Sequence, residues 1–498
     1  MLVFPVAYMC FAGCSKSNVD LIGHSCVIDK SKITVSLAPT QNPLVARYSV
    51  VSSCSAKATV EFGPDTNYGQ ETSSGTNNIL VAGMRQFTTY HMRARLDFPD
   101  GSQVFDSDRV FTTGGLPPER LPMVSVTRSP TLQPNPGIEL IDAVNLSASI
   151  ETSKVNAAAF DLEGNLIWFY DLTDGSEIDS AFPIKMLPSG NFLMVVIGAF
   201  NGVREINLAG ETISQFSVDD VNKSLVLAGS QIAISSLHHD ILPLANGHLI
   251  LLGNFNQTIA QAGAEAIVDV LIDLDERRRP VWMWSAFDHL DIHRQPFGLP
   301  DWTHANAVIY SPDDGNLIVS LRNQNWVAKI DYRDGRGDGS VLWRFGPGGD
   351  FAISGGNSGD LNYAQHYPVL IGPETSGVFP LMLYDNGNGR IVDSVETHCG
   401  GAEAIPCYSR PVIFELDENS RTAKIEWQYK LPFFSPCCGN TNILGNGNIE
   451  FDAISLDPVS SRIQEVTQVS DPQLVWQMDL TEQLAYRAFR IPSLYPRR

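Results

Sequence analysis

The sequence has few basic residues, with 34 Lys and Arg against 55 Asp and Glu and a formal net charge of -21. Nucleic acids and anionic membrane surfaces attract positively charged proteins, so this balance argues against both as partners. Beyond the N-terminus, no run of residues is apolar for long enough to cross a bilayer, and nothing indicates an integral membrane protein. An anionic substrate would therefore have to be held by a few local cations.

The sequence also shows scarcely any helical periodicity. Its 498 residues, of which 43% are hydrophobic, are enough for two buried cores. From about residue 28 to 113, segments such as "KITVSLAP" and "KATVEFG" alternate with turns in a period of two. This pattern predicts a small antiparallel β-sandwich similar to a fibronectin type III module. "GGLPPERLP" then forms a linker, which places the sandwich domain at 24–116.

A different unit repeats over 120–498, an apolar strand, a turn and a strand that ends in an aromatic residue. Six such hairpins occur, among them "FDLEGNLIWFY", "IDLDERRRPVWMW" and "FELDENSRTAKIEWQY", and further strands follow turns such as "LPSGN" and "LANGH". Six units of four short strands predict a six-bladed β-propeller. An array of sandwiches is the weaker alternative, and the chain is all-β in either case.

The N-terminus, "MLVFPVAYMCFAGCSKS", is an apolar run that ends in small residues and Cys14. It resembles an export signal or the cleavage site of a bacterial lipoprotein, so residues 1–18 are interpreted as a leader. A buried strand is the alternative. We expect an exported, periplasmic protein, and the sequence leaves open whether it is soluble or carries a lipid anchor.

Eight cysteines suit an oxidising compartment better than the cytosol, provided that they pair. Cys437 and Cys438 are adjacent, so at most one of them joins an ordinary bridge easily. No C-x-x-C pair occurs and no histidine stands at zinc-finger spacing, which makes a zinc site the weaker interpretation. The predicted disulfides are Cys399–Cys407, at the mouth of the propeller channel, and, with weaker support, Cys26–Cys54.

Polar residues recur where the innermost strands of a propeller would meet at its axis. "HHDILPLANG", "THANAVIYSPDDG" and "QHYPVLIG" are aligned so that His239, Asn306 and His366 are equivalent, with Arg322 one strand after His304. A single strand histidine is more often structural, and that interpretation is kept for His24, His91, His248, His289, His293 and His398. The cluster beside one arginine predicts an anion site, whose residues are His366, His304, Arg322, His239, Asn306 and His238.

Five segments together resemble the bacterial arylsulfate sulfotransferases: "HHD", "WTHANAV" with "SLRNQNW", "QHYP", "LYDNGNGR" and "AYRAFRIPSLY". The resemblance covers nearly the whole chain, because that family also joins an N-terminal β-sandwich to a six-bladed propeller. It implies transfer of a sulfuryl group between phenols through a sulfated histidine, without a nucleotide donor. His366 would be the nucleophile, and the anion-binding shell would comprise His239, His304, Asn306 and Arg322. Strand register favours His239 over His238.

The resemblance implies ping-pong kinetics, an aryl sulfate donor, a phenolic acceptor and neither metal nor cofactor. A homodimer is left open. Sulfuryl transfer should resemble phosphoryl transfer, in which positioning and electrostatics dominate, and a neutral imidazole with an ordinary pKa of about 6.5 is a suitable nucleophile. Three other functions remain open: a metal-dependent propeller hydrolase or lactonase, a quinone-dependent dehydrogenase, and a non-catalytic ligand-binding propeller.

Overall fold

The computed structural model describes residues 33–144, 155–171, 180–198, 200–259, 264–392, 399 and 407–496. Nearly all regular structure in these ranges is β-strand, so the prediction of an all-β chain is confirmed. The only α-helices in these ranges are short: α1 (Val218–Leu227) and α2 (Ala286–His289). The predicted leader, residues 1–18, lies outside the described residues.

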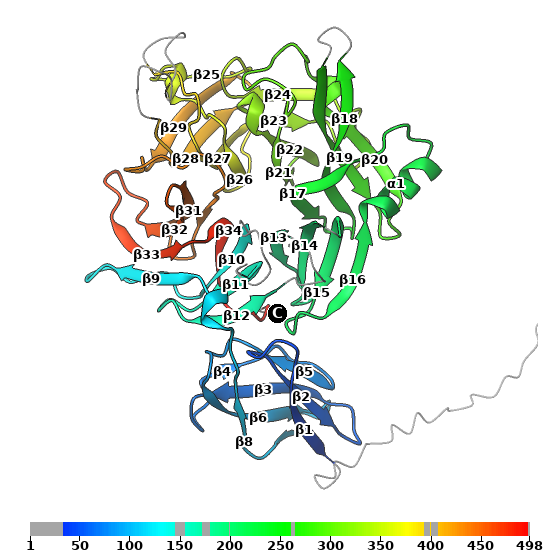
Figure 1. Cartoon of the computed structure of the whole chain (residues 1–498), viewed down its shortest axis with the longest axis vertical. Coiled ribbons are helices and arrows are strands. Elements are labelled where there is room, and N and C mark those ends of the chain that lie inside the picture. Colours follow the sequence, from blue (N-terminus) through cyan, green and yellow to red (C-terminus); the bar gives the residue numbers. More distant parts are fainter. Residues whose placement is uncertain are drawn as a thin grey trace, which may run out of the picture.

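Two sheets form the N-terminal part of the described chain, at the bottom of Figure 1. Buried and partly exposed residues alternate along β6, because one face of the sheet is covered and the other meets solvent. Side chains from both sheets pack in one apolar cluster, for example Tyr48, Val60 and Met92. The first sheet contains β1 (Thr34–Pro39), β2 (Ala46–Val51) and β5 (Asn78–Val81), and the second contains β3 (Lys57–Gly63), β4 (Gln70–Glu71), β6 (Thr89–Asp97), β7 (Gln103–Phe105) and β8 (Arg109–Thr112).

Six further sheets of four or five strands follow in the described chain and surround a common centre in Figure 1. In chain order they are: β10 (Ile138–Val144), β11 (Ala157–Phe160) and β12 (Leu166–Tyr170) with β34 (Leu484–Ile491); β13 (Ser180–Met186), β14 (Phe192–Ile197), β15 (Gly202–Ile206) and β16 (Thr212–Ser217); β17 (Ser236–Pro243), β18 (Leu249–Ile259), β19 (Ala264–Leu274) and β20 (Pro280–Ser285); β21 (Ala305–Ser311), β22 (Asn316–Leu321), β23 (Trp326–Ile330) and β24 (Val341–Phe345); β25 (Ala352–Ile353), β26 (His366–Leu370), β27 (Val378–Asp385), β28 (Arg410–Asp417) and β29 (Thr422–Gln428); and β30 (Thr441–Ile443), β31 (Ile449–Leu456), β32 (Val459–Val466) and β33 (Leu474–Thr481) with β9 (Met123–Arg128). Three 3₁₀ turns, η2 (Pro118–Arg120), η3 (Arg322–Gln324) and η4 (Ser358–Asp360), lie in the connections.

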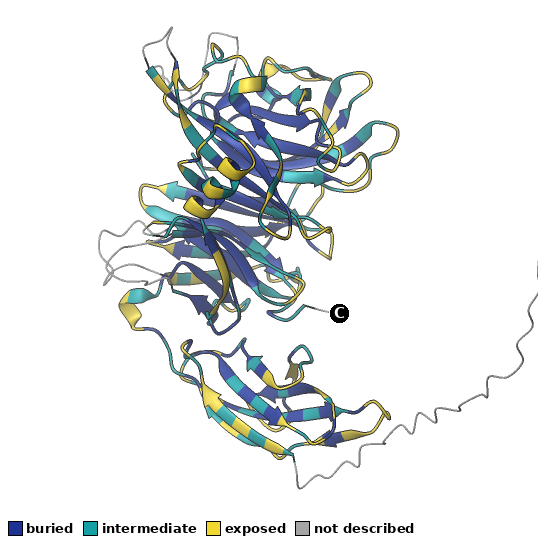
Figure 2. Ribbon diagram, turned by 90° about the vertical axis from the view of Figure 1, so that its right-hand side faces the viewer, coloured by how far each residue is buried: buried dark blue, intermediate teal, exposed yellow. Residues whose placement is uncertain are grey.

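The sheets pack face to face, and the packing includes both internal strands and the edge strand β12. β12 ("LIWFY") and β22 ("NLIVSL") are buried at every residue, because both of their faces are covered by neighbouring sheets. One apolar cluster joins Leu193 and Val203 of one sheet to Leu237 and Val270 of the next. Figure 2 accordingly shows buried residues along the strands and exposed ones at the loops and on α1.

The two ends of this part of the chain close the ring of sheets. β34 pairs with β10 in the first sheet, and β9 adds to β33 at the edge of the last one. Beyond β34, the Tyr495 hydroxyl accepts a hydrogen bond from Ala82 N at 2.6 Å and donates one to Leu80 O at 3.0 Å. The C-terminal segment therefore also ties the ring to the N-terminal sheets.

Candidate active site

Three neighbouring inner strands, β17, β21 and β26, carry His238 and His239, Asn306, and His366 (Figure 1), and His304 directly precedes β21. Each strand has a bulge at its start, between Leu237 and Ile241 in β17, between Ala305 and Ala307 in β21, and after His366 in β26. Bulges bend a strand and change the direction of its side chains, and they are frequent at functional sites. The local backbone, not the regular pleat, sets the direction of these side chains.

The predicted equivalence of His239, Asn306 and His366 is wrong. His239 and Asn306 lie inside the bulges of their strands and have no pairing partner, whereas His366 pairs with Tyr384 before the bulge of β26 begins. The bulges insert extra residues at different places, so counting back from the turns gives a false register. The backbone of His239 is also left-handed, with φ of 56°.

The structure nevertheless brings the predicted histidines together. The ring centroid of His239 lies 4.7 Å from that of His304 and 4.9 Å from that of His238. The Tyr486 ring joins them to the third strand, since its centroid lies 5.7 Å from His239 and 6.4 Å from His366. Side chains that are far apart in sequence thus form one aromatic and polar cluster.

Asn386 determines which nitrogen of His366 carries a proton. The Asn386 amide group donates to Ser435 O at 3.0 Å and to Cys438 O at 3.1 Å, so its Oδ1 is the atom that faces His366 Nδ1 at 2.7 Å. An amide oxygen only accepts hydrogen bonds, and His366 Nδ1 must therefore carry the hydrogen. In the neutral ring the lone pair then lies on Nε2.

His366 and His239 are both held in the neutral form. Burial lowers the pKa of His366 well below its ordinary value, and the charges of Arg322, His304 and Arg487 act in the same direction. Burial likewise lowers the pKa of His239 well below its ordinary value, with the neighbouring histidines adding to the effect. Both rings keep a lone pair at neutral and mildly acidic pH.

His304 has a carboxylate partner. Its Nδ1 lies 2.5 Å from Asp301 Oδ2, and the carboxylate accepts this hydrogen bond. Burial opposes ionisation of Asp301, but the hydrogen bond and charge of His304 outweigh burial and lower the pKa of Asp301. The pair fixes the His304 ring with Nε2 on the side away from Asp301. Such an orientation suits a group that transfers protons.

His238 packs behind His239. Its Nδ1 shares one hydrogen with His239 Nδ1 at 2.8 Å, and its Nε2 lies 3.1 Å from Asp269 Oδ1. Asp269 also accepts a hydrogen bond from the backbone of Ala305 at 2.6 Å. His238 therefore connects His239 to the strand that follows His304.

Arg322 begins η3, directly after β22, and its charge is not neutralised by a carboxylate among the described residues. Its guanidinium donates to Asn323 Oδ1 at 2.7 Å and to Pro436 O at 3.2 Å, and both acceptors are neutral. Burial lowers the pKa of Arg322, yet an arginine remains charged at neutral pH. The cation is available to an anion.

Asn306 is fully buried and lies beside the backbone before His366. Its amide nitrogen donates to Gln365 O at 2.8 Å, while its Oδ1 has no hydrogen-bond partner. The contact ties β21 to the start of β26. That Asn306 also binds the substrate stays a prediction.

Four residues of this cluster were not singled out from the sequence: Asn386, Asp301, Arg487 and Tyr486. The Arg487 guanidinium donates to Asn306 O at 2.8 Å and lies 3.4 Å from Asp240 Oδ1, and it is buried. "LYDNGNGR" and "AYRAFRIPSLY" contain Asn386, Tyr486 and Arg487, but nothing in these motifs shows which residue faces the site. Asp301 directly precedes "WTH" in the sequence, and its position three residues before His304 could have indicated that the two side chains interact.

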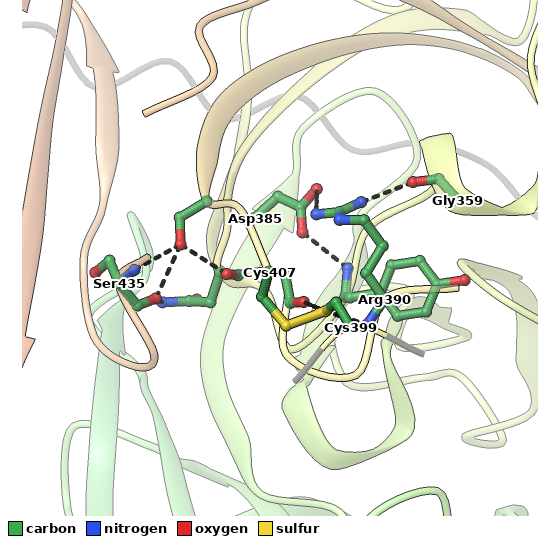
Figure 3. The surroundings of a disulfide bond; sticks show 10 residues. Gly359, Asp385, Arg390, Cys399, Cys407 and Ser435 are labelled. Atoms are coloured by element: carbon green, nitrogen blue, oxygen red, sulfur yellow. Dashed lines mark hydrogen bonds and ion pairs between the residues drawn. A yellow bond between two sulfur atoms is a disulfide. The ribbon is translucent and has the colours of Figure 1, made fainter. Parts of the chain in front are cut away.

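The predicted disulfide between Cys399 and Cys407 is present, with a Cα–Cα distance of 4.9 Å. Figure 3 shows it beside Arg390 and Asp385, with Ser435 on the opposite side. The backbone N of Arg390 donates to Cys399 Sγ at 3.1 Å, and Arg390 follows Asn386, the hydrogen-bond partner of His366, by four residues. Cys54 is also disulfide-bonded, but its predicted partner Cys26 lies outside the described residues.

Among the described residues, no three His, Cys, Asp or Glu side chains come together in a way that could hold a metal ion. A search of the same residues finds no helix that is long and apolar enough to cross a membrane.

Comparisons with known proteins identify the family. The chain is similar in fold to an apocarotenoid oxygenase mutant from Synechocystis, with 9% identity over 74% of this chain and 96% of that one and a TM-score of 0.32. It is also similar to hydrazine synthase from Kuenenia stuttgartiensis, with 11% identity over 72% and 48% of the two chains and a TM-score of 0.31. No curated protein matches the sequence. The model of the family "Arylsulfotransferase (ASST)" matches residues 135–487, which is well over half of the sequence and includes every predicted site residue. The chain belongs to the arylsulfotransferase family.

Proposed function

We propose that the protein transfers a sulfuryl group from an aryl sulfate ester to a phenol through a covalent intermediate on His366 Nε2. The observation that supports this assignment most strongly is the Asn386 amide, which leaves the lone pair of the neutral His366 ring on Nε2. The family match supports sulfotransferase chemistry in general. The covalent intermediate and the roles of the individual residues go beyond the family match and are part of our proposal.

The first half-reaction forms one bond and breaks another. His366 Nε2 attacks the sulfur of the donor, the S–O bond to the aryl group breaks, and the electron pair leaves with the phenoxide oxygen. The imidazole becomes an N-sulfated ring whose Nδ1–H still donates to Asn386 Oδ1. A neutral nucleophile is required because an aryl sulfate is an anion, and the low pKa of His366 provides one.

Arg322 stabilises the sulfuryl oxygens. Its hydrogen bonds to Asn323 and Pro436 orient the guanidinium without cancelling its charge. Negative charge on the sulfuryl oxygens and the leaving oxygen develops in a loose transition state, where a preorganised cation contributes most. Because Arg322 is only partly exposed, the interaction is stronger than it would be in open water.

His304 transfers the protons. In its protonated form, oriented by Asp301, it gives a proton to the departing phenoxide, and the neutral ring then takes the proton of the incoming phenol. The phenol oxygen attacks the sulfur, the S–N bond breaks, and His366 regains its lone pair. His239 lies against His304 and is held neutral, so we assign it to binding the substrate. His238 orients His239, and Asn306 positions His366.

We also propose the finer architecture that this function requires. The six sheets of residues 120–498 are the six blades of a propeller, and residues 24–116 form a fibronectin III-like sandwich. Residues 1–18 direct export to the periplasm, where small aryl sulfates and phenols are the substrates.

Transient kinetics test the covalent step. Donor mixed rapidly with the protein in the absence of acceptor should release one equivalent of phenol in a burst, and rates with both substrates should show a ping-pong pattern. His366→Asn should lose the burst. His248→Asn is the control, because His248 pairs with Asp273 and is not part of the cluster. Intersecting kinetic lines without a burst would indicate direct transfer and refute the proposal.

A further inference from the structure

Two adjacent cysteines that the mechanism does not use lie at the edge of the site. Cys437 and Cys438 are both free, and their Sγ atoms are 3.2 Å apart. Cys438 is buried, whereas Cys437 is half-buried. Arg322 Nη2 donates to the carbonyl of Pro436, the residue directly before Cys437, at 3.2 Å.

The backbone of the same segment holds two groups of the proposed mechanism. Pro436 O accepts a hydrogen bond from Arg322 Nη2 at 3.2 Å, and Cys438 O accepts one from Asn386 Nδ2 at 3.1 Å. Asn386 in turn sets the protonation of His366. A rearrangement of residues 436–438 would therefore reach both the anion-binding cation and the nucleophile.

We propose that Cys437 and Cys438 form a redox-sensitive dithiol, which small-molecule disulfides oxidise to a bond between the two adjacent residues, and that this oxidation slows sulfuryl transfer. The effect on transfer rests on the proposed function. The dithiol itself rests on the geometry of the two sulfurs and does not depend on it.

The two thiols have different reactivity. The hydrogen bond with Cys438 lowers the pKa of Cys437, burial opposes this change, and the charge of Arg322 lowers the pKa further. The same hydrogen bond and burial raise the pKa of Cys438 well above its ordinary value. Because the thiolate is the nucleophile in disulfide exchange, Cys437 reacts first.

The oxidation is two successive exchanges. The Cys437 thiolate attacks one sulfur of oxidised glutathione, the S–S bond breaks, and one glutathione leaves as a thiolate. The Cys438 thiol then loses its proton and attacks Cys437 Sγ, which releases the second glutathione. The two cysteines lose two electrons and the disulfide reagent gains them.

Formation of a disulfide between Cys437 and Cys438 must move the backbone. Adjacent Cα atoms are about 3.8 Å apart across a trans peptide, whereas disulfides usually join Cα atoms about 4.4 to 6.8 Å apart. The sulfurs must also approach from 3.2 Å to about 2.05 Å. Cys438 already has a left-handed backbone, with φ of 60°, and the next residue, Gly439, has φ of 89°. The Pro436 and Cys438 carbonyls lie next to the atoms that must shift.

The Cys399–Cys407 pair provides an internal comparison. Its cysteines are eight positions apart and already bonded, with an ordinary Cα–Cα distance of 4.9 Å. A bond between adjacent cysteines is strained in comparison and easier to reduce. One region thus holds a permanent disulfide and a dithiol that can change its state.

Oxidised glutathione followed by a mild thiol reductant tests the proposal on the full-length protein. Tryptic peptides 431–462 and 391–421 separate the dithiol from the permanent disulfide, so their masses report the two pairs independently. In the wild type, peptide 431–462 should lose two hydrogens, turnover should fall by about 10- to 100-fold, and reductant should restore both. Cys437→Ser should show no change in the ratio of treated to untreated turnover, and Cys438→Ser should stop at a glutathione adduct on Cys437.

Several outcomes of this experiment would contradict the proposed dithiol switch. Two free thiols in peptide 431–462 after prolonged treatment, or a disulfide there with unchanged turnover, would overturn the proposal. So would a loss of turnover that follows a change in peptide 391–421 alone. If the untreated protein transfers no sulfuryl group, the proposed function fails, whereas the mass of peptide 431–462 still reports the state of the dithiol.

Discussion

Two regions that lie side by side in the structure use their arginines in opposite ways. Arg390 and Arg410 share the buried carboxylate of Asp385, at 2.6 and 2.8 Å, and their other hydrogen bonds go to the protein as well. Arg322 binds only neutral acceptors among the described residues. The first two arginines have a buried carboxylate as counter-charge without a ligand, whereas Arg322 makes no ion pair with a carboxylate among the described residues. Although the charge of Asp301 acts on Arg322, an anionic ligand would compensate more of its charge.

The histidines differ in the same way. His248 and His304 each face a carboxylate, Asp273 and Asp301 respectively. His366 faces an amide oxygen, which orients the ring but adds no negative charge. Carboxylates favour the protonated form of histidine, so the amide is the partner expected for a neutral nucleophile.

The largest effect on stability should come from the paired region. Asp385→Asn leaves Arg390 and Arg410 buried without a counter-charge, and we expect a loss of about 3 to 5 kcal/mol in the free energy of unfolding. Denaturant unfolding measures it. Asp331→Asn is the control, because its partner Arg333 is exposed and the pair should contribute little to the free energy of unfolding. Equal losses in the two variants would show that Asp385 is not essential to its network.

At Arg322 we expect the reverse, a large loss of activity with little loss of stability. Arg322→Lys keeps the charge but loses the planar two-pronged donor, and we expect kcat/KM to fall by about 100-fold, equivalent to roughly 3 kcal/mol. The unfolding free energy should change little, because no ion pair is broken. Steady-state rates with an activated aryl sulfate, together with denaturant unfolding, check both parts. Near-normal turnover would place Arg322 outside the site.

A smaller effect should follow from the partner of the nucleophile. Asn386→Ala removes the acceptor that holds the proton on His366 Nδ1, so both tautomers become populated and the ring loses its orientation. We expect the burst rate to fall by about 10-fold, the cost of roughly one hydrogen bond. Ser409→Ala is the matched control, since Ser409 contacts the same Asn386 backbone and the Ser435 carbonyl without touching His366. If the burst is equally slow in Asn386→Ala and Ser409→Ala, the loss comes from disturbing the segment around Ser435 and not from the His366 tautomer.

The smallest change should appear in the pH dependence. Burial and positive neighbours disfavour the protonated ring, so the pKa of His366 lies below the ordinary value of about 6.5 and the neutral nucleophile persists as the pH falls. The wild-type burst rate should thus stay level through pH 6.5 and decline only well below it. Arg322→Gln removes a positive neighbour, which raises the pKa of His366 and moves the acid limb to higher pH. An unchanged limb in Arg322→Gln would contradict the assignment.

Much of the fold follows from the sequence because period and turns are local signals. The alternating strands and the repeated hairpins predicted an all-β chain, and "LPSGN" and "LANGH" are turns in the structure. β25, which adds a parallel pair to the fifth sheet, was not predicted, because two residues carry no period. The prediction placed Cys399–Cys407 correctly, since eight positions allow a short loop to close.

The site could be predicted only in part. The histidines and Arg322 could be predicted as site residues because polar side chains are unusual in or next to apolar strands. They also fall within the motifs "HHD", "WTHANAV" with "SLRNQNW", and "QHYP". Their register could not be counted, because bulges add residues that no pattern reveals. Asn386 and Arg487 act through hydrogen bonds to carbonyl groups of segments distant in the sequence, and such contacts exist only after the sheets assemble.

Mass spectrometry of the peptide that contains "QHYP" tests the central claim most directly. Donor added without acceptor, followed by digestion at mildly alkaline pH, should leave one sulfuryl group on His366. Addition of a phenol before digestion should remove it, and His366→Asn should never acquire it. An unlabelled peptide from protein that turns over normally, or a sulfuryl group on His239 or His304 instead, would contradict the account.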